Sequence, residues 1–239
     1  DESESRGLGD VYKRQDMKVM ILAAGYGRRL LPVTEVTPKP LLEVNGKSLI
    51  QRNIETLIAS GFDEFVINIS YLGQMIKEHV SHIFPGVKIS FSQEASPLGT
   101  GGGVLAALDI LGEDPFILIN SDICHDINIK NLSPDIESAH LIGIKNPDHN
   151  PDGDFSLDGD ILIIKEGNND FTWTGISVIN PAIFSNIMNQ EGPFDMWKSV
   201  MIEPIQNKTV TAEITHSNWI DTGTLERLEL ANKIYKDEN

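Results

Sequence analysis

The segment 17–40, MKVMILAAGYGRRLLPVTEVTPKP, decides which fold the chain is expected to adopt. It opens with a run of apolar residues, which is typical of a strand that is buried on both faces. Gly25 and Gly27 follow at once. A glycine-rich turn after such a strand lets backbone amides approach an anion closely. The segment therefore predicts the first strand and the first ligand-binding loop of an α/β protein.

Strands and helices alternate along the first half of the chain. Three further apolar runs predict buried strands: 65–69, 88–92 and 116–120. Three helical patterns accompany them: 49–60, 72–83 and 104–111. Ser48 is placed to cap the first of these helices, and Gly61 to end it. The alternation indicates a parallel sheet with helices on both faces.

The second half of the chain changes character. Asp158 and Gly159 lie between two short apolar runs and predict a hairpin. Further strands are expected at 172–179, 209–215 and 218–221, and further helices after Pro181, at 194–205 and from Thr224 onward. We therefore expect an α/β fold, a Rossmann-like doubly wound mixed sheet, whose later insertions shape a second substrate pocket.

This fold is expected to occupy one domain, residues 17–239, because no repeat or linker divides the chain. Residues 1–16 show no helix or strand period. They are interpreted as a disordered, non-native extension, with a native regulatory tail as the alternative.

The composition narrows the class of partner. With 239 residues, 40% of them hydrophobic, the chain is long enough to bury a substantial core. A formal net charge of -16 argues against nucleic acid, because phosphate backbones are held by basic surfaces. No apolar run approaches the ~20 residues that cross a bilayer, and the start lacks the order of a secretion signal. A cytoplasmic protein with no membrane contact and a small-molecule substrate is therefore expected.

Two basic residues lie in the loop after the first strand. Arg29 offers a planar fork for phosphate oxygens, and Lys39 is a compact cation suited to a crowded phosphate pair. A dinucleotide-binding loop is the obvious alternative, but that motif requires a third glycine where this chain has Leu30. It also requires a helix to begin at once, whereas Pro32 and the prolines after it favour an extended loop.

Two aspartates are candidate metal ligands. Asp122 follows the predicted strand 116–120, at the end where ligands of open α/β sheets bind. Asp221 follows a short strand near the other end of the chain, and magnesium is commonly held by one or two carboxylates plus substrate phosphates. The alternative is that each aspartate only forms a turn or caps a helix. If both bind one ion, these distant residues must meet in space.

The loop and the two aspartates together resemble a known family. The chain carries the motif Gly25-x-Gly27-x-Arg29-x-x-Pro32, followed by Thr37-Pro38-Lys39-Pro40. This motif resembles the signature of the sugar-1-phosphate nucleotidyltransferases. The resemblance implies that Arg29 and Lys39 stabilise charge on the attacked phosphate and on the leaving pyrophosphate, and that Mg2+ is required. The segments around Asp122 and Asp221 match the two metal-binding segments of that family.

The resemblance also implies which residues bind each substrate. The nucleotide would be bound by Ala23, Ala24, Gly25, Gly27, Gln93, Gly99, Thr100, Gly101 and Asn120. Among these, Gln93 and the backbone near Gly99 would read the pyrimidine. The sugar would be bound by Asp154, Thr174 and Gly175, for which ordinary hairpin and strand roles remain the alternative.

Several segments resemble one branch of the family, which transfers a uridylyl group from UTP to N-acetylmuramate 1-phosphate in cell-wall recycling. These segments are PLGTGGG, GDFSL and TWTGISVINPAIF. Lys165-Glu166-Gly167 departs from the Glu-Lys-Pro segment of thymidylyltransferases, which leaves a role for Lys165 in doubt. The same chemistry on mannose or glucose 1-phosphate, and a non-catalytic nucleotide-sugar sensor, remain alternatives. A monomer or a homodimer is expected.

Overall fold

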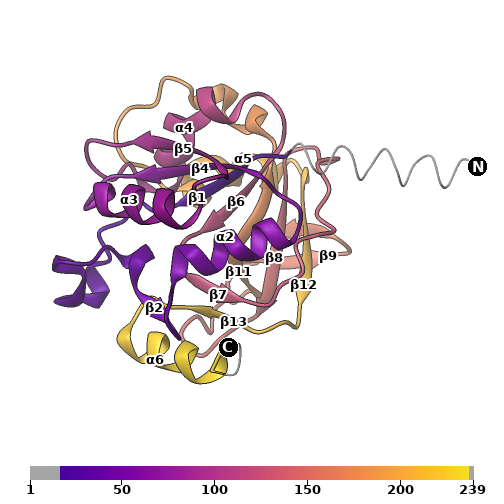
Figure 1. The fold of residues 1–239 in the computed structure, drawn as a ribbon. Coiled ribbons are helices and arrows are strands. Elements are labelled where there is room, and N and C mark those ends of the chain that lie inside the picture. Colours follow the sequence, from indigo (N-terminus) through magenta and orange to yellow (C-terminus); the bar gives the residue numbers. More distant parts are fainter. Residues whose placement is uncertain (1–16, 237–239) are drawn as a thin grey trace, which may run out of the picture.

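The computed structural model describes residues 17–236, so the predicted extension at 1–16 lies outside the described residues. A nine-stranded sheet runs through this part of the chain in the order β5-β4-β1-β6-β11-β8-β12-β10-β9 (Figure 1). Buried clusters of apolar side chains pack on both of its faces. The predicted doubly wound α/β fold with a mixed sheet is confirmed.

The first four strands in this order form the parallel half of the sheet: β5 (Lys88–Gln93), β4 (Glu64–Ile69), β1 (Val19–Leu22) and β6 (Phe116–Asn120). Every neighbouring pair among them is parallel. All four were predicted from their apolar runs. Because parallel strands end at the same edge, the loops that follow them meet along that edge.

The other five strands form the mixed half: β11 (Phe171–Ile179), β8 (Ala139–Lys145), β12 (Val210–Thr215), β10 (Ile161–Ile163) and β9 (Ser156–Asp158). Strand β11 is antiparallel to both β6 and β8, whereas β12 is parallel to β8. Strands β9 and β10 pair around Gly159, which confirms the predicted hairpin.

Helices cover the sheet in two layers. The first includes α2 (Leu49–Ala59) and α3 (Gly73–Ile83), and the second includes α4 (Gly99–Leu111) and α5 (Ile202–Gln206). Strand β1 packs against both layers, because successive side chains of a strand point to opposite faces of the sheet. Val19 and Ile21 belong to the cluster formed with α2 and α3, and Met20 to the cluster formed with α4.

The loop predicted to be extended folds instead into short 3-10 turns, so that prediction was wrong. The turns are η1 (Arg28–Leu30), η2 (Val33–Glu35) and η3 (Lys39–Leu41). Backbone bonds close them; Leu30 N donates to Gly27 O at 2.9 Å and Leu41 N to Pro38 O at 2.8 Å. Proline fits the start of such a turn, where its missing N–H costs nothing.

The helix predicted at 194–205 is interrupted. A π-helical turn, η5 (Trp197–Met201), leads directly into α5. Pro204 supplies the physical reason, since a proline cannot donate the backbone bond that an unbroken α-helix needs four residues back. The helix predicted at 104–111 begins earlier, at Gly99, so the glycine-rich turn is itself the first turn of α4.

A two-stranded ribbon outside the main sheet joins the two halves of the chain. Strand β7 (Ile123–His125) pairs antiparallel with β13 (Trp219–Asp221), and α6 (Leu225–Ile234) follows. Cys124 and Ile220 of this ribbon share a buried cluster with Leu30 of the loop and Ala231 of α6. The ribbon thus holds the first loop and the last helix together.

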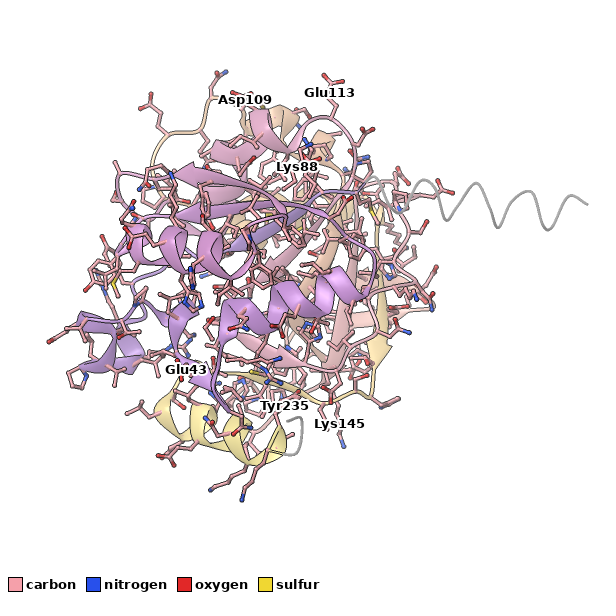
Figure 2. The ribbon with its side chains drawn as sticks, viewed as in Figure 1. Glu43, Lys88, Asp109, Glu113, Lys145 and Tyr235 are labelled. Atoms are coloured by element: carbon pink, nitrogen blue, oxygen red, sulfur yellow. The ribbon has the colours of Figure 1, made fainter. Side chains whose placement is uncertain are left out.

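The remaining short elements are β2 (Glu43–Val44), β3 (Lys47–Ser48) and η4 (Pro181–Ile187). Charged side chains such as Glu113 and Lys145 are exposed on the outside of the molecule (Figure 2). Among the described residues, no helix has the length and apolar character needed to cross a membrane.

Candidate active site

A cavity of about 370 Å³ opens at the carboxyl ends of β1, β4 and β6. We call it the first cavity. Most of the predicted nucleotide-binding and catalytic residues line it: Ala23, Ala24, Gly25, Gly27, Arg29, Lys39, Gly99, Thr100 and Asn120. Asp122 also lines it. The predicted first loop, the glycine-rich turn and the end of β6 therefore share one hollow.

A second cavity of about 410 Å³ adjoins the first and shares Arg29, Asn120 and Asp122 with it. Asp221 lines only the second cavity. So do Asp154 and Thr174, two of the three predicted sugar-binding residues. The mixed half of the sheet thus supplies a second pocket, as expected of the later insertions.

Three predicted site residues lie outside the walls of both cavities. Gln93 ends β5 with an exposed side chain, whereas its neighbour Glu94 is buried and lines the first cavity. Neighbouring residues of an extended chain point to opposite sides, and here Glu94 is the one that faces the first cavity, so the role of Gln93 in reading the base stays a prediction.

Gly101 and Gly175 each pack closely against a neighbouring side chain, and their roles in binding the substrates stay predictions. A Cβ at Gly101 would lie 2.6 Å from the Phe194 ring, so this face of α4 turns away from the first cavity. Gly175 has a φ of +82°, and a Cβ there would lie 2.5 Å from Nδ2 of Asn120. Gly175 thus lets β11 pass close to a side chain that lines both cavities.

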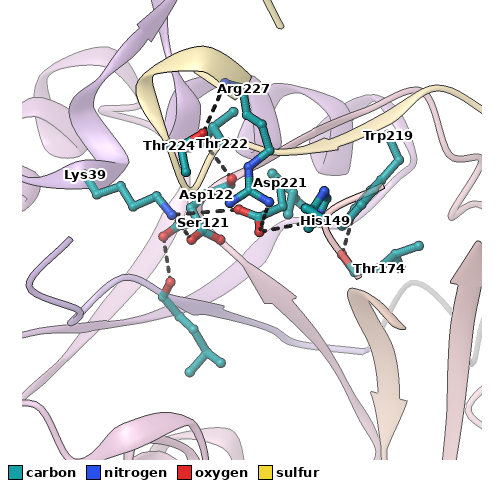
Figure 3. A network of polar contacts seen from close by, with 12 residues as sticks. Lys39, Ser121, Asp122, His149, Thr174, Trp219, Asp221, Thr222, Thr224 and Arg227 are labelled. Atoms are coloured by element: carbon teal, nitrogen blue, oxygen red, sulfur yellow. Dashed lines mark hydrogen bonds and ion pairs between the residues drawn. The ribbon is translucent and has the colours of Figure 1, made fainter. Parts of the chain in front are cut away.

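Lys39 lines the first cavity and lies beside Asp122 and Asp221 (Figure 3). It is only 8% exposed, and its ammonium group donates a hydrogen bond to Oδ2 of Asp122. The same nitrogen lies 4.0 Å from Oδ1 of Asp221. One buried cation therefore contacts two carboxylates that are distant in sequence, and the predicted convergence of these aspartates is present in the structure.

The ribbon explains why the two aspartates meet. Asp221 is the register partner of Ile123, the residue after Asp122. The backbone N–H and the hydroxyl of Thr222 both donate to the Asp122 carbonyl, at 3.0 and 2.7 Å. On the other side, Nδ2 of Asn53 donates to the Ile123 carbonyl at 3.1 Å. Both aspartate backbones are therefore held by neighbouring elements.

The carboxylate of Asp221 has further partners on one oxygen. Nη1 of Arg227, from α6, lies 3.3 Å from Oδ2, and Nε2 of His149 lies 4.0 Å from the same atom. Burial lowers the pKa of His149 below its ordinary value, and the charge of Arg227 lowers it further. The other oxygen, Oδ1, is buried without a hydrogen-bond partner among the described residues.

These donors suit a hard divalent cation. Two carboxylates face one point, and Oδ1 of Asp221 has acceptor capacity that no described hydrogen bond uses. No group of three or more His, Cys, Asp or Glu side chains within residues 17–236 could hold a metal by itself. A cation here would thus need further oxygen ligands from a substrate, as is common for magnesium.

The second cavity contains residues that the sequence analysis missed. The ring of His149 stacks on Trp219 with centroids 6.3 Å apart, and the indole N–H of Trp219 donates to the Thr174 carbonyl at 2.8 Å. The carboxylate of Asp154 accepts from Nδ2 of Asn150 and from the Trp173 backbone N–H, at 3.0 and 2.8 Å. Nothing in the local sequence around His149 indicates this position.

Comparisons with known proteins agree with this geometry. Residues 18–152 match the protein family described as Nucleotidyl transferase. The chain is 39% identical over 228 residues to the N-acetylmuramate alpha-1-phosphate uridylyltransferase of Neisseria meningitidis serogroup B, covering 91% of this chain and 98% of that protein. It is 28% identical over 224 residues to the mannose-1-phosphate guanyltransferase of Schizosaccharomyces pombe, covering 87% of this chain and 61% of that protein.

Among solved structures, the fold is similar to that of a Bacillus anthracis protein assigned provisionally as a glucose-1-phosphate thymidylyltransferase. The TM-score is 0.81 at 23% identity, with 93% of this chain and 96% of that chain covered. At this identity the similarity supports the fold alone.

Proposed function

Since the chain belongs to the nucleotidyl transferase family, we propose that it transfers a uridylyl group from UTP to N-acetyl-α-muramate 1-phosphate, releasing pyrophosphate. The observation that carries the proposal is the meeting of Arg29, Lys39, Asp122 and Asp221 where the two cavities join. The choice of base and sugar rests on 39% identity to an enzyme of that name over nearly the whole chain.

The reaction joins two anions, and the two cavities suit one each. A phosphate oxygen of the sugar 1-phosphate forms a bond to the α-phosphorus of UTP, while the bond from that phosphorus to pyrophosphate breaks. Arg29 lines both cavities, so its guanidinium can contact the reacting phosphates from either side. Positioning and charge neutralisation dominate this type of transfer, because no protein nucleophile is needed.

Lys39 would neutralise charge at the junction of the cavities. Its ammonium group is buried and held by Asp122, so it is oriented before the substrates bind. A preoriented charge that needs no reorganisation is worth more than a mobile one in a site that excludes water. We assign Lys39 to the charge that develops on the attacked phosphate and on the departing pyrophosphate.

We propose Asp122 and Asp221 as the ligands of Mg2+. A bound magnesium ion supplies charge neutralisation for the triphosphate. Arg227 and Thr222 act on the ligands themselves, since Arg227 contacts Oδ2 of Asp221 and Thr222 bonds the Asp122 carbonyl. These contacts would hold the Asp221 carboxylate and the Asp122 backbone in place before a metal binds.

The second cavity would take the sugar. Asp154 and Thr174 line it, as proposed from the resemblance, and the stacked pair His149 and Trp219 adds an aromatic wall. Both oxygens of Asp154 already accept hydrogen bonds from the protein, so Asp154 is held rigidly at the cavity wall. We further propose a cytoplasmic enzyme of peptidoglycan recycling, monomeric or homodimeric, whose substrates are these small molecules.

The proposal is tested with a panel of triphosphates against sugar 1-phosphates, read by pyrophosphate release in the presence of Mg2+. We expect the fastest release with UTP and N-acetylmuramate 1-phosphate, and none when either substrate is omitted. Preference for GTP with mannose 1-phosphate would replace the proposed substrates with those named for the Schizosaccharomyces pombe relative. Binding of nucleotide sugars without any turnover would indicate a sensor.

A further inference from the structure

Two buried polar side chains at the wall of the first cavity have no role in the chemistry described above. Asn68, near the end of β4, and Glu94, directly after β5, are each only 3% exposed. Both line the first cavity. A buried carboxylate is costly unless hydrogen bonds or charges compensate it, so the partners of Glu94 indicate what it does.

These two side chains connect two distant backbone segments. The Ala23 N–H, at the start of the first loop, donates to Oδ1 of Asn68 at 2.8 Å. Nδ2 of Asn68 donates to Oε1 of Glu94 at 2.6 Å, and Oε2 of Glu94 accepts from the Leu98 N–H at 2.8 Å. One continuous chain of hydrogen bonds therefore runs from the first loop to the residue before Gly99.

Helix α4 lies directly over this connection. A Cβ at Gly103 would lie 2.5 Å from Nδ2 of Asn68 and 2.9 Å from Oε1 of Glu94. No other residue type would leave room for the pair at this distance. The glycine thus allows the first turn of α4, which lines the first cavity through Gly99 and Thr100, to rest on the two side chains.

We propose that Asn68 and Glu94 are positioning residues for the nucleotide. They hold the glycine-rich turn at Leu98 and Gly99 in a fixed place relative to the first loop, and so set the geometry of the nucleoside part of the first cavity. This inference rests on the proposed function, in that the first cavity binds a nucleoside triphosphate. It assigns a role in nucleotide affinity rather than in the transfer step.

The pattern of donors and acceptors makes the proposal testable by exchange. Two backbone N–H groups require an acceptor at each end, and the middle bond requires one donor and one acceptor. One amide and one carboxylate meet these requirements, whichever of positions 68 and 94 carries the amide. Two amides bring two donors together, and two carboxylates bring two charged acceptors together, so each single exchange breaks the chain of bonds.

The experiment measures the equilibrium binding of UTP in the presence of Mg2+ to wild type, Glu94→Gln, Asn68→Asp and the double variant that combines both. We expect each single variant to bind UTP about tenfold more weakly, because one buried polar group loses its partner. The double variant should recover most of the wild-type affinity, since Gln at 94 can donate to Asp at 68.

Two further measurements separate positioning from loss of the fold. For Glu94→Gln we expect weaker binding of UTP but nearly unchanged binding of pyrophosphate, which needs the first loop and not the glycine-rich turn. In steady state, KM for UTP should rise with little change in kcat. A stability control is Asn180→Ala, at a residue that lines neither cavity. It removes a bond donated to the Glu137 carbonyl and a bond accepted from the Ala182 N–H, and should lower Tm without weakening UTP binding.

The proposal is overturned if both single variants bind UTP like wild type, or if the double variant regains the wild-type Tm while UTP binding stays weak. Should the substrate panel show that wild type prefers another triphosphate, the same four proteins are measured with that nucleotide. A wrong choice of base therefore leaves this test intact, and failure of the exchange leaves the proposed transfer reaction intact.

Discussion

The parallel and mixed halves of the sheet contribute to the active site in different ways. The parallel half lines the first cavity with the loops that follow its strands, including glycine-rich turns at Gly25, Gly27 and Gly99. The second cavity is lined by strand β11 and the loops of the mixed half, which supply His149 and Asp154, and by Trp219 of the ribbon. Backbone amides suit phosphates, which all nucleotides share, whereas side chains can vary with the sugar. The comparison fits the proposal that the first cavity binds the nucleotide and the second cavity binds the sugar.

The junction of the two halves should show the largest effect. Asp122→Asn keeps the shape of the side chain but removes a charge that contacts Lys39 and a proposed ligand of Mg2+. We expect turnover to fall at least about 100-fold at saturating substrates and metal. Initial rates of pyrophosphate release measure this.

A matched control for this variant is Asp109→Asn, which changes an exposed aspartate on α4. It should keep the wild-type rate. Near-normal turnover of Asp122→Asn at saturating Mg2+ would remove Asp122 from the proposed metal site.

Gly175→Ala tests the close packing of β11, in the mixed half, against β6, in the parallel half. The new Cβ would lie 2.5 Å from the Asn120 side chain, at a φ of +82° that favours glycine. We expect the free energy of unfolding to fall by about 3 kcal/mol, as strain and crowding add. Chemical denaturation measures it.

Gly167→Ala separates the two contributions. Gly167 also has a positive φ, +91°, but nothing lies within 4 Å of its Cβ position. Backbone strain alone should cost about 1 kcal/mol there. Equal losses in the two variants would show that contact with Asn120 adds nothing.

The ribbon of β7 and β13 should make the stability of the fold depend on pH. His125 of β7 is buried, and this burial lowers its pKa from 6.5 to about 4. Between pH 6.5 and pH 4, His125 is therefore protonated in the unfolded chain but neutral in the folded chain. The free energy of unfolding has its full value above pH 6.5 and falls as the pH drops toward 4. The slope from this residue is at most about 1.4 kcal/mol per pH unit.

Unfolding free energies of wild type and His125→Gln, measured between pH 7 and pH 4, check this. The variant should lose this part of the slope. A slope that is identical in both proteins would assign the acid sensitivity to other groups.

The smallest effect is expected inside the second cavity. Trp219→Phe keeps an aromatic ring beside His149 but removes the indole N–H that bonds the Thr174 carbonyl. We expect KM for the sugar phosphate to rise about fivefold, the value of one hydrogen bond, while KM for UTP stays nearly constant. Steady-state kinetics with each substrate varied in turn measure this.

The control is Trp197→Phe. Trp197 stacks on Trp173 but does not itself line the second cavity. Neither KM should change. An equal rise of both KM values in Trp219→Phe would contradict the assignment of the nucleotide to the first cavity and the sugar to the second.

Local patterns were sufficient for the parallel half. Its strands are short apolar runs ended by turns, and the period of the side chains alone indicates them. Local patterns do not indicate that Glu94 rather than Gln93 lines the first cavity, because a shift of one residue along an extended chain reverses which side chain faces the cavity. Local patterns also predicted a continuous helix at 194–205, whereas the structure has a π-helical turn, η5, before α5. Only the folded structure shows how the chain accommodates Pro204.

The sequence by itself determined the fold class and the residue types that can hold phosphates and a divalent cation, because both follow from local period and chemical type. Only the tertiary structure decided which of these residues meet. Asp122 lies in the middle of the chain and Asp221 near its carboxyl end, and their contact with Lys39 depends on the pairing of β7 with β13. His149, Arg227, Asn68 and Glu94 have no local signal, since each acts through a partner that only the folded chain brings near.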